Sequence, residues 1–216
     1  MITRILICFA LGAVPFSVLA MYGSGIDIRK VGSGNPGFNN VLRVSRSRAL
    51  WALLGDMGKG VLALVLVWLL FPPVVKGDAG SGLAAYFAAH PGMHRVVEGW
   101  IFGFAAILGH CFSPFLRFKG GKGIATSAGV MLVLYPVYAV AALAYFAAAR
   151  VAGSKLGWRE SGAVASLSSW ILFVLLLVLL KGRVDAICAS LVAVFIFWRH
   201  QHNLRHIFRG KQEVPA

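Results

Sequence analysis

Long apolar runs alternate along the chain with short polar segments that are rich in Gly, Lys and Arg. The runs long enough for a membrane helix cover 3–22, 50–71, 96–116, 163–180 and 184–198, and a sixth run, 124–149, is interrupted only by Pro136. About 20 apolar helical residues cross the hydrocarbon core of a bilayer, whereas barrel strands show strict alternation, which is absent here. The pattern therefore predicts an all-α integral membrane bundle.

The composition supports this prediction and adds a charge signal. Of 216 residues, 59% are hydrophobic and only 13% are charged, yet the formal net charge is +14. These values exclude an ordinary soluble domain, a disordered tail and a disulfide scaffold. Because the basic residues lie between apolar runs, we interpret them as orienting the chain in the lipid bilayer, and we expect no nucleic-acid partner.

The positions of Lys and Arg predict the topology. The segment 23–50 is far more basic than the residues before the first run, so the N-terminus should lie outside and this segment in the cytoplasm. A single span over 124–149 would place the basic segments 150–162 and 199–211 outside. Two short half-helices that meet near Pro136 remove both conflicts, because proline breaks a helix. We therefore predict about seven membrane segments, with the C-terminus cytoplasmic.

The whole chain, 1–216, is expected to be a single polytopic domain. Arg4 and the sequence Val18-Leu19-Ala20 are loosely typical of a secretory signal, but an uncleaved first helix is the preferred interpretation. The three Cys residues are far apart in apolar segments, and no Cys or carboxylate completes a cluster with the His residues. The sequence thus predicts neither a metal site nor another cofactor.

The first informative polar segment is Gly32-Ser33-Gly34-Asn35-Pro36-Gly37, which continues to Asn40 and Arg43. Its glycines and proline prevent a helix and leave backbone N–H groups able to face an anion. Ser33 adds a hydroxyl group, and Arg43 adds a guanidinium group suited to phosphate. From composition alone, a flexible basic loop between helices explains the segment equally well.

The second segment, Phe118 to Thr126, contains Lys119-Gly120-Gly121-Lys122-Gly123 and runs directly into a helix. Free N–H groups, a positive helix end and two lysines at one place favour a phosphate site. The segment is not a Walker A loop, since residue 116 is Leu and Gly123 replaces the Ser or Thr that would bind magnesium. Nucleotide hydrolysis is therefore not expected.

Two further features carry polar groups. The tail, from Arg199 through His200 and Asn203 to His206, is by itself typical of a basic amphipathic end that lies on anionic lipid. Asp56 and Lys59 are three residues apart in an apolar run, which favours a structural ion pair and leaves open a functional role at membrane depth. These separated segments, all predicted on one side, are expected to meet around a phosphate-rich ligand.

Four segments, in this order, resemble the bacterial acyl-phosphate:glycerol-3-phosphate acyltransferases, the PlsY family. They are Asp27 to Gly37 with Asn40-Val41-Leu42-Arg43, then Asp56 with Lys59-Gly60, then Gly109-His110 through Thr126, and finally His200 with Asn203 and Gly210. The resemblance covers nearly the whole chain. It implies transfer of a fatty acyl group from acyl phosphate to the 1-hydroxyl of glycerol 3-phosphate, which gives lysophosphatidic acid and phosphate in the first step of bacterial phospholipid synthesis.

The resemblance also implies the site residues. Those expected to be catalytic are Ser33, Lys122, Ser166, His200 and Asn203. Those expected to bind substrate are Arg43, Gly120, Gly121, Gly123, Asn35 and Asn40. Ser161 and Ser168 compete with Ser166 for the position of a family serine. The chain departs from the family at Phe38-Asn39, where Ala-Thr is expected, and at Gln212, where a Glu is expected and Glu213 follows one place late.

The expected partners are acyl phosphate, glycerol 3-phosphate and the bilayer, with no obligatory protein partner. The expected location is the bacterial inner membrane, with the active site facing the cytoplasm. Direct transfer without an acyl-enzyme is the preferred mechanism, with Ser33 or Ser166 as the alternative nucleophile. A transporter or channel for phosphate-bearing solutes is the main alternative function, because half-helices that face an anion also occur in transporters.

Overall fold

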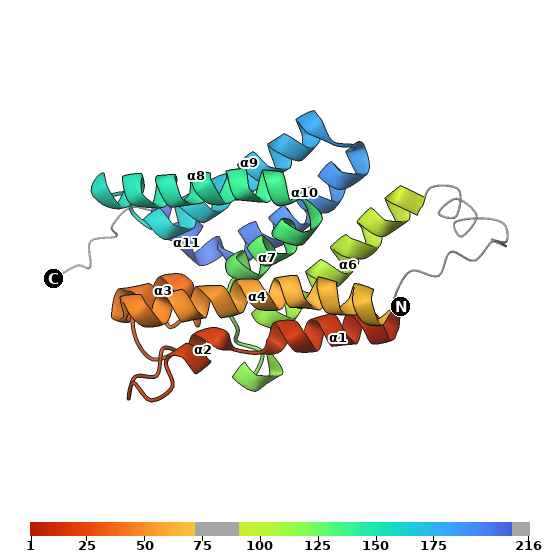
Figure 1. Ribbon diagram of the computed structural model, residues 1–216. Coiled ribbons are helices and arrows are strands. Elements are labelled where there is room, and N and C mark those ends of the chain that lie inside the picture. Colours follow the sequence, from red (N-terminus) through yellow and green to blue (C-terminus); the bar gives the residue numbers. More distant parts are fainter. Residues whose placement is uncertain (72–90, 209–216) are drawn as a thin grey trace. The chain divides into compact units, whose positions relative to one another are not determined.

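The computed structural model describes residues 1–71 and 91–208, and these residues form helices and loops without a strand (Figure 1). The helices are α1 (Ile2–Ala13), α2 (Phe16–Ala20), α3 (Phe38–Val44), α4 (Arg46–Leu70), α6 (Pro91–Cys111), the short 3₁₀ helix η1 (Pro114–Leu116), α7 (Ile124–Leu134), α8 (Pro136–Lys155), α9 (Ser161–Leu180), α10 (Arg183–Arg199) and α11 (Gln201–Phe208). The all-α prediction is confirmed for the described part of the chain.

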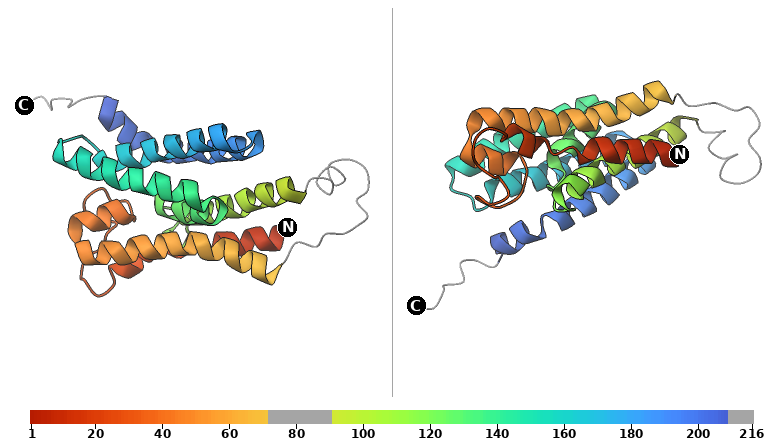
Figure 2. Two further views of the ribbon diagram at one scale, coloured as in Figure 1. Left: turned by 45° about the horizontal axis from the view of Figure 1, so that its top comes forward. Right: turned by 90° about the horizontal axis from the view of Figure 1, so that it is seen from below.

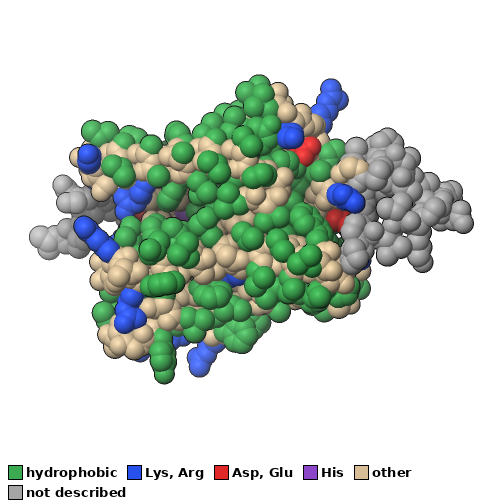
Figure 3. All heavy atoms as spheres, viewed as in Figure 1, with side chains coloured by type: hydrophobic (Ala, Val, Ile, Leu, Met, Phe, Trp, Pro, Cys, Tyr) green, Lys and Arg blue, Asp and Glu red, His purple; other side chains and the backbone are tan. Residues whose placement is uncertain are grey.

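Five segments among the described residues are long and apolar enough to cross a membrane. They are Ile2–Ala20, Arg46–Leu70, Arg95–Leu116, Pro136–Lys155 and Ser161–Leu180. The pair α10 and α11, bent by 65° at the break between them, forms a sixth segment if it is counted as one span. Large hydrophobic side chains are exposed along these helices, and they cover much of the surface seen in Figure 3. The predicted membrane bundle is therefore supported, while the count of seven and the orientation remain predictions.

The break at Pro136 is confirmed, but the two halves are unequal. α7 has 11 residues and is the short apolar helix that was predicted. α8 has 20 residues and differs from the predicted half-helix, because it continues through Arg150 to Lys155. Arg and Lys are good helix formers, and proline costs nothing as the first residue of a helix. The charge pattern alone had placed these residues in a loop.

The chain divides into two compact units, Met1–Pro136 and Val137–Ala216, which are described separately. In the first unit α4 packs against α1, α2, α3, α6 and α7, and α1 packs against α6. Gly12 of α1 lies against the backbone of Ala106, and Gly109 of α6 lies against that of Phe9, so neither glycine has room for a side chain. Such close backbone contacts stabilise helix pairs in membranes.

The helix α7 begins beside the middle of α4 rather than beside its end. Gly60 of α4 lies against the carbonyl group of Thr126, and Gly129 of α7 lies against that of Met57. Since a helix rises about 1.5 Å per residue, these contacts lie roughly 15 to 20 Å along α4 from its first residue. The glycine-rich segment that precedes α7 therefore approaches α4 at mid-height, instead of lying at the helix ends.

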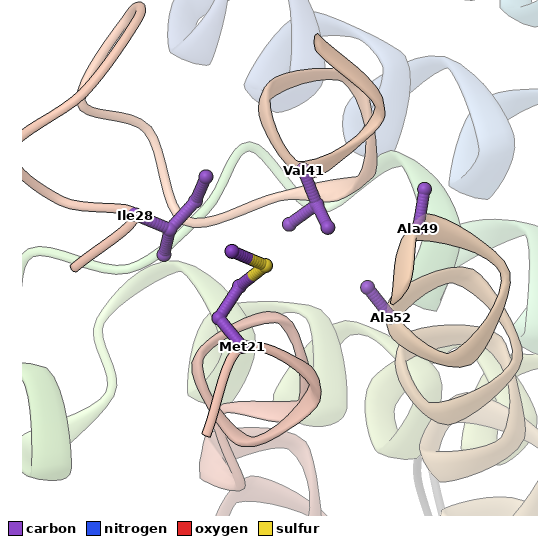
Figure 4. Close-up of a cluster of buried hydrophobic side chains, with 5 residues drawn as sticks. All are labelled: Met21, Ile28, Val41, Ala49 and Ala52. Carbon is purple, nitrogen blue, oxygen red and sulfur yellow. The ribbon is translucent and has the colours of Figure 1, made fainter. Parts of the chain in front are cut away.

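The loop between α2 and α3 is anchored by a small apolar cluster. Met21 and Ile28 pack against Val41 of α3 and against Ala49 and Ala52 of α4, as Figure 4 shows. All five side chains are buried. This cluster fixes both ends of the segment that carries Ser33.

The second unit contains α8, α9, α10 and α11. α9 packs along α10, and α11 follows α10 after a turn at His200 (Figure 2). The end of α8 meets the start of α9, since Gly153 faces Ser161 and the guanidinium group of Arg150 donates a 3.1 Å hydrogen bond to the Ser161 hydroxyl. These contacts explain why α8 extends to Lys155.

Candidate functional site

Asn40 holds the first glycine-rich segment in shape. Its Oδ1 accepts a 3.0 Å hydrogen bond from the N–H of Ser33, and its Nδ2 donates to the carbonyl groups of Ile28 and Val31, both at 3.0 Å. Gly32 and Gly34 have φ angles of 58° and 66°, a region that favours glycine. The carboxamide of Asn40 is thus engaged with the loop backbone, and its role in binding substrate stays a prediction.

The remaining predicted residues of this segment face outward. Ser33 is exposed, and its hydroxyl accepts a 3.4 Å hydrogen bond from the N–H of Asn35. Arg43 is exposed at the end of α3, and within the described residues its side chain makes no hydrogen bond or ion pair. This guanidinium group is therefore accessible to an anion, and its role in binding substrate stays a prediction.

Asp27 and Arg29 neutralise each other at the start of the same segment. The guanidinium group of Arg29 donates to both carboxylate oxygens of Asp27, at 2.8 and 2.9 Å. These hydrogen bonds lower the pKa of Asp27 to about 2 and raise that of Arg29. Arg29 is consequently a weaker candidate than Arg43 for binding a phosphate group.

The second glycine-rich segment is held tightly against the end of α6. The N–H of Gly120 donates a 3.1 Å hydrogen bond to the carbonyl group of Cys111, and a Cβ at Gly120 would collide with the carbonyl oxygen of His110. A Cβ at Gly121 would collide with Nε2 of the His110 imidazole. Gly123, with φ of 88°, is the N-cap of α7. The segment therefore positions half-buried Lys122 at the positive end of a helix.

A buried polar cluster lies beside this segment. Lys59 Nζ is 2.8 Å from Asp56 Oδ1, and His110 Nδ1 is 3.4 Å from the same oxygen. The side chains of Asp56, Lys59 and His110 are 2%, 3% and 6% exposed. Charged groups at this depth are costly unless paired, so the cluster has either a structural or a functional reason to be retained.

Part of that reason is structural, because the cluster supplies hydrogen-bond partners where the helix is broken between α1 and α2. Pro15 interrupts the first span, and the carbonyl groups before it lose their helical partners. Lys59 Nζ donates to the carbonyl of Val14 at 2.7 Å, and the Ser113 hydroxyl donates to that of Ala13 at 2.6 Å. The Ser17 hydroxyl donates to Asp56 Oδ2 at 2.8 Å. The helices α1 and α2 are thus bonded to α4 and to the residues that follow α6.

The cluster opens into a small cavity of about 10 Å³. The polar side chains that line it are those of Ser17, Asp56, Lys59, His110 and Ser113. Pro36 of the first glycine-rich segment and Gly121 of the second also line this cavity. The structure therefore brings the first two predicted motifs together at one place within the first unit.

The third predicted motif lies in the second unit. Nδ1 of buried His200 is 2.8 Å from the carbonyl oxygen of Ile196. Because a carbonyl group only accepts hydrogen bonds, Nδ1 carries the proton and Nε2 is the basic atom of the neutral ring. Asn203 Nδ2 donates a 2.7 Å hydrogen bond to Glu160 Oε2, and Glu160 Oε1 is 3.8 Å from His206 Nδ1.

The three competing serines lie near the start of α9. The Ser166 hydroxyl is fully buried and donates to the Gly162 carbonyl at 2.7 Å, one helical turn earlier. Ser168 bonds in the same way to Val164, and Ser161 accepts from Arg150. The hydroxyl groups of Ser166 and Ser168 are thus each engaged with a carbonyl group of their own helix.

Comparisons with known proteins decide between the interpretations that the geometry leaves open. The glycerol-3-phosphate acyltransferase family matches residues 2–210. The chain belongs to this family. Curated glycerol-3-phosphate acyltransferases of Deinococcus radiodurans and Aromatoleum aromaticum are each 36% identical to it, and the alignments cover 96% of this chain and 92% and 93% of theirs.

A crystal structure of PlsY, an integral membrane glycerol 3-phosphate acyltransferase, in its glycerol 3-phosphate form matches with a TM-score of 0.75 at 25% identity. The match covers 97% of this chain and 92% of that one. The lysophosphatidic acid form of PlsY matches with a TM-score of 0.74. The family resemblance and the integral membrane fold are thereby confirmed.

Sequence reasoning missed several residues, in each unit, that lie beside the predicted ones. Ser17 and Ser113 gave no signal, because single serines in apolar runs are common, and Glu160 lay in a segment interpreted only through its charge. His110 stood in a recognised motif but was given no role. The positions of Gly210, Gln212 and Glu213 lie outside the described residues.

Proposed function

We propose that this family member transfers a fatty acyl group from an acyl phosphate to the 1-hydroxyl of glycerol 3-phosphate, with lysophosphatidic acid and inorganic phosphate as products. The observation that carries the proposal is the cavity at which Pro36 of one glycine-rich segment meets Gly121 of the other. Family membership supplies the acceptor, and the related PlsY structures contain glycerol 3-phosphate or lysophosphatidic acid. No observation favours the transporter alternative.

In the proposed reaction the hydroxyl oxygen of the acceptor forms a bond to the acyl carbon, and the bond from that carbon to the phosphate oxygen breaks. Phosphate leaves with the electron pair, and the hydroxyl proton ends on it, directly or through His200 Nε2. Because an acyl phosphate is already activated, holding the reactants together is the main task. Well-oriented reactions gain about 7–11 kcal/mol in this way.

The two substrates are both anionic, so the site needs positive groups. Arg43 and Ser33 are assigned to anchoring one phosphate group. Lys122 and the N–H groups of Gly121 and Gly123 are assigned to the other phosphate or to the oxygen of the reacting acyl group, whose negative charge increases in the transition state. Gly120, whose N–H donates to the Cys111 carbonyl, is assigned to holding this segment in place. Asn35 is assigned to the same phosphate group as Ser33, whose hydroxyl accepts a hydrogen bond from the Asn35 N–H. Asn203 is assigned to a substrate oxygen, and Ser166 to supporting α9.

The proposed location is the bacterial inner membrane, with the site facing the cytoplasm, the N-terminus outside and the C-terminus inside. Within the first unit, Arg4 lies near Phe71 and Glu98, while Arg48 bonds to the carbonyl groups of Ala20 and Tyr22. Successive helices therefore run in alternate directions, as the topology requires. Labelling of Trp158→Cys from the cytoplasmic side would support the proposal, and labelling from the outside would contradict it.

A phosphate-release assay tests the activity. Purified protein supplied with palmitoyl phosphate and glycerol 3-phosphate should release inorganic phosphate and form lysophosphatidic acid in equal amounts, whereas palmitoyl-CoA should not replace the donor. Lys122→Ala, which removes the proposed phosphate ligand, should reduce turnover at least about a thousandfold with an unchanged melting temperature. Intact protein that forms no product from palmitoyl phosphate would refute the proposed donor.

A further inference from the structure

The proposed reaction leaves the buried pair of Asp56 and His110 without a chemical role. Lys59 and the two serines, Ser17 and Ser113, are explained by the break between α1 and α2. His110 contacts Asp56 and the second glycine-rich segment. It is 6% exposed and lies at a depth where ionisable side chains are retained for a reason.

The two edges of the His110 imidazole face different partners. Nδ1 is 3.4 Å from Asp56 Oδ1, whereas Nε2 lies where a Cβ of Gly121 would be. The position of Asp56 is fixed in turn by the 2.8 Å contact with Lys59 and by the hydrogen bond from Ser17. A carboxylate that holds one ring nitrogen sets the orientation of the whole ring, as it does for histidines beside metals.

The glycine-rich segment therefore lies on a ring whose orientation is fixed by α4. Gly120 contacts the backbone of the same histidine, so both central glycines of the segment depend on residue 110. A phosphate site made of backbone N–H groups requires the chain to hold one conformation before the ligand arrives. The support for that conformation comes from α4 and α6, not from the segment itself.

We propose that His110, oriented by Asp56, is a positioning residue that presets residues 120–123 for binding phosphate. It does not act as the general base, because a base must lie within hydrogen-bond reach of the substrate proton and Gly121 covers the Nε2 edge. In its kinetic part this inference rests on the proposed function.

Three substitutions separate the contributions of the two ring edges. His110→Ala removes both contacts, and we expect the KM for glycerol 3-phosphate or acyl phosphate to rise at least about tenfold while kcat changes less than about threefold. His110→Gln keeps a polar atom near Nε2 and should restore most of the affinity. His110→Asn keeps a donor near Nδ1 but leaves the space below Gly121 empty, so the KM should stay high.

Two kinetic outcomes would overturn the proposal. A fall in kcat with an unchanged KM would make His110 a catalytic base. Equal losses in the Ala and Gln variants, together with a lower melting temperature, would give it a purely structural role. Ser190→Ala, which removes a hydroxyl group bonded within α10 of the other unit, is the matched control and should leave both constants unchanged.

A second measurement does not depend on the reaction. Hydrogen exchange of the full-length protein in detergent, without substrates, should be at least about tenfold faster at residues 119–124 in His110→Ala, and unchanged in α3. Unchanged exchange at 119–124 would refute the positioning role even if the enzyme is active. Faster exchange in a protein that releases no phosphate would support the positioning role while refuting the proposed function.

Discussion

The two glycine-rich segments have similar compositions but are held in different ways. Residues 27–40 carry their own support, since Asn40 bonds to three backbone groups of the segment and an apolar cluster fixes its ends. Residues 117–123 depend on their surroundings, because Gly120 and Gly121 rest on His110 of α6. The first segment is internally hydrogen-bonded and the second is packed from outside.

This difference follows from where each segment lies. The first lies beyond the ends of α2 and α4, where Ser33 and Arg43 remain exposed and need a local framework. The second is packed against the end of α6, so closely that Gly120 and Gly121 have no room for a side chain. Glycine therefore provides positive φ angles at Gly32, Gly34 and Gly123, and close contact with a neighbouring residue at Gly120 and Gly121.

The largest expected effect comes from adding a side chain to a glycine of the second segment, residues 117–123. In Gly120→Ala the new Cβ would meet backbone atoms of His110 and Cys111, which cannot move aside as a flexible side chain does. We expect kcat/KM to fall at least about a hundredfold and the unfolding free energy to fall by about 1–3 kcal/mol. Gly58→Ala is the control, since a Cβ there meets nothing and helix propensity slightly favours alanine. Near-normal activity of Gly120→Ala would contradict the claim that this segment has no room for a side chain at residue 120.

The next effect comes from removing the internal support of the first segment. Asn40→Ala would leave the Ser33 N–H and two carbonyl groups without their partner, and we expect to lose about 2–4 kcal/mol of stability. Neighbouring Asn39 provides the comparison, because its buried Oδ1 has no hydrogen-bond partner. Asn39→Ala should therefore be neutral or slightly stabilising in thermal unfolding. Equal losses at both positions would show that the hydrogen bonds of Asn40 are not what holds the segment.

A smaller effect is expected in the second unit. Glu160→Ala removes the acceptor that orients Asn203, whereas Glu160→Gln keeps an acceptor oxygen in reach. We expect turnover to fall about tenfold in the first variant and less than about twofold in the second, since a single orienting hydrogen bond contributes roughly 1–1.5 kcal/mol. If the Gln variant lost as much activity as the Ala variant, the negative charge would matter instead of the hydrogen bond.

The smallest effect is expected at Asp27. Its pKa is lowered to about 2 by Arg29, so the stabilising contribution is present above the ordinary pKa near 4 and is lost as the pH falls towards 2. Exposed ion pairs contribute little, so Asp27→Asn should leave turnover at neutral pH within about twofold. Any difference in melting temperature between the two proteins should narrow between pH 4 and pH 2. A difference in melting temperature that grows between pH 4 and pH 2 would contradict a stabilising role of the Asp27 carboxylate.

The helical segments were predictable because the apolar runs indicate the helices and Pro136 indicates where one of them breaks. The length of α8 was not, since its last residues are held by a contact between Arg150 and Ser161 that the sequence does not reveal. The break at Pro15 was also missed, because its cost is offset by Lys59 and Ser113, which are distant along the chain.

In the candidate site, too, some features could be predicted from the sequence and others depend on contacts between distant residues. The motif residues Ser33, Arg43 and Lys122 were proposed from their chemistry, and Pro36 and Gly121 of their two segments line one cavity. The supporting residues were not found, because support is a property of packing. The bonds from Asn40 to the loop backbone were not foreseen. Its role in binding substrate, and the meeting of these segments with His200 and Asn203, remain predictions.

The central claim is that both glycine-rich segments form one phosphate pocket, and hydrogen exchange with and without glycerol 3-phosphate tests it most directly. The account predicts that the ligand slows exchange at residues 32–38 and at residues 119–124 together, and that Lys122→Ala weakens the protection of both. Protection of only one segment, or of neither at a saturating concentration, would contradict it.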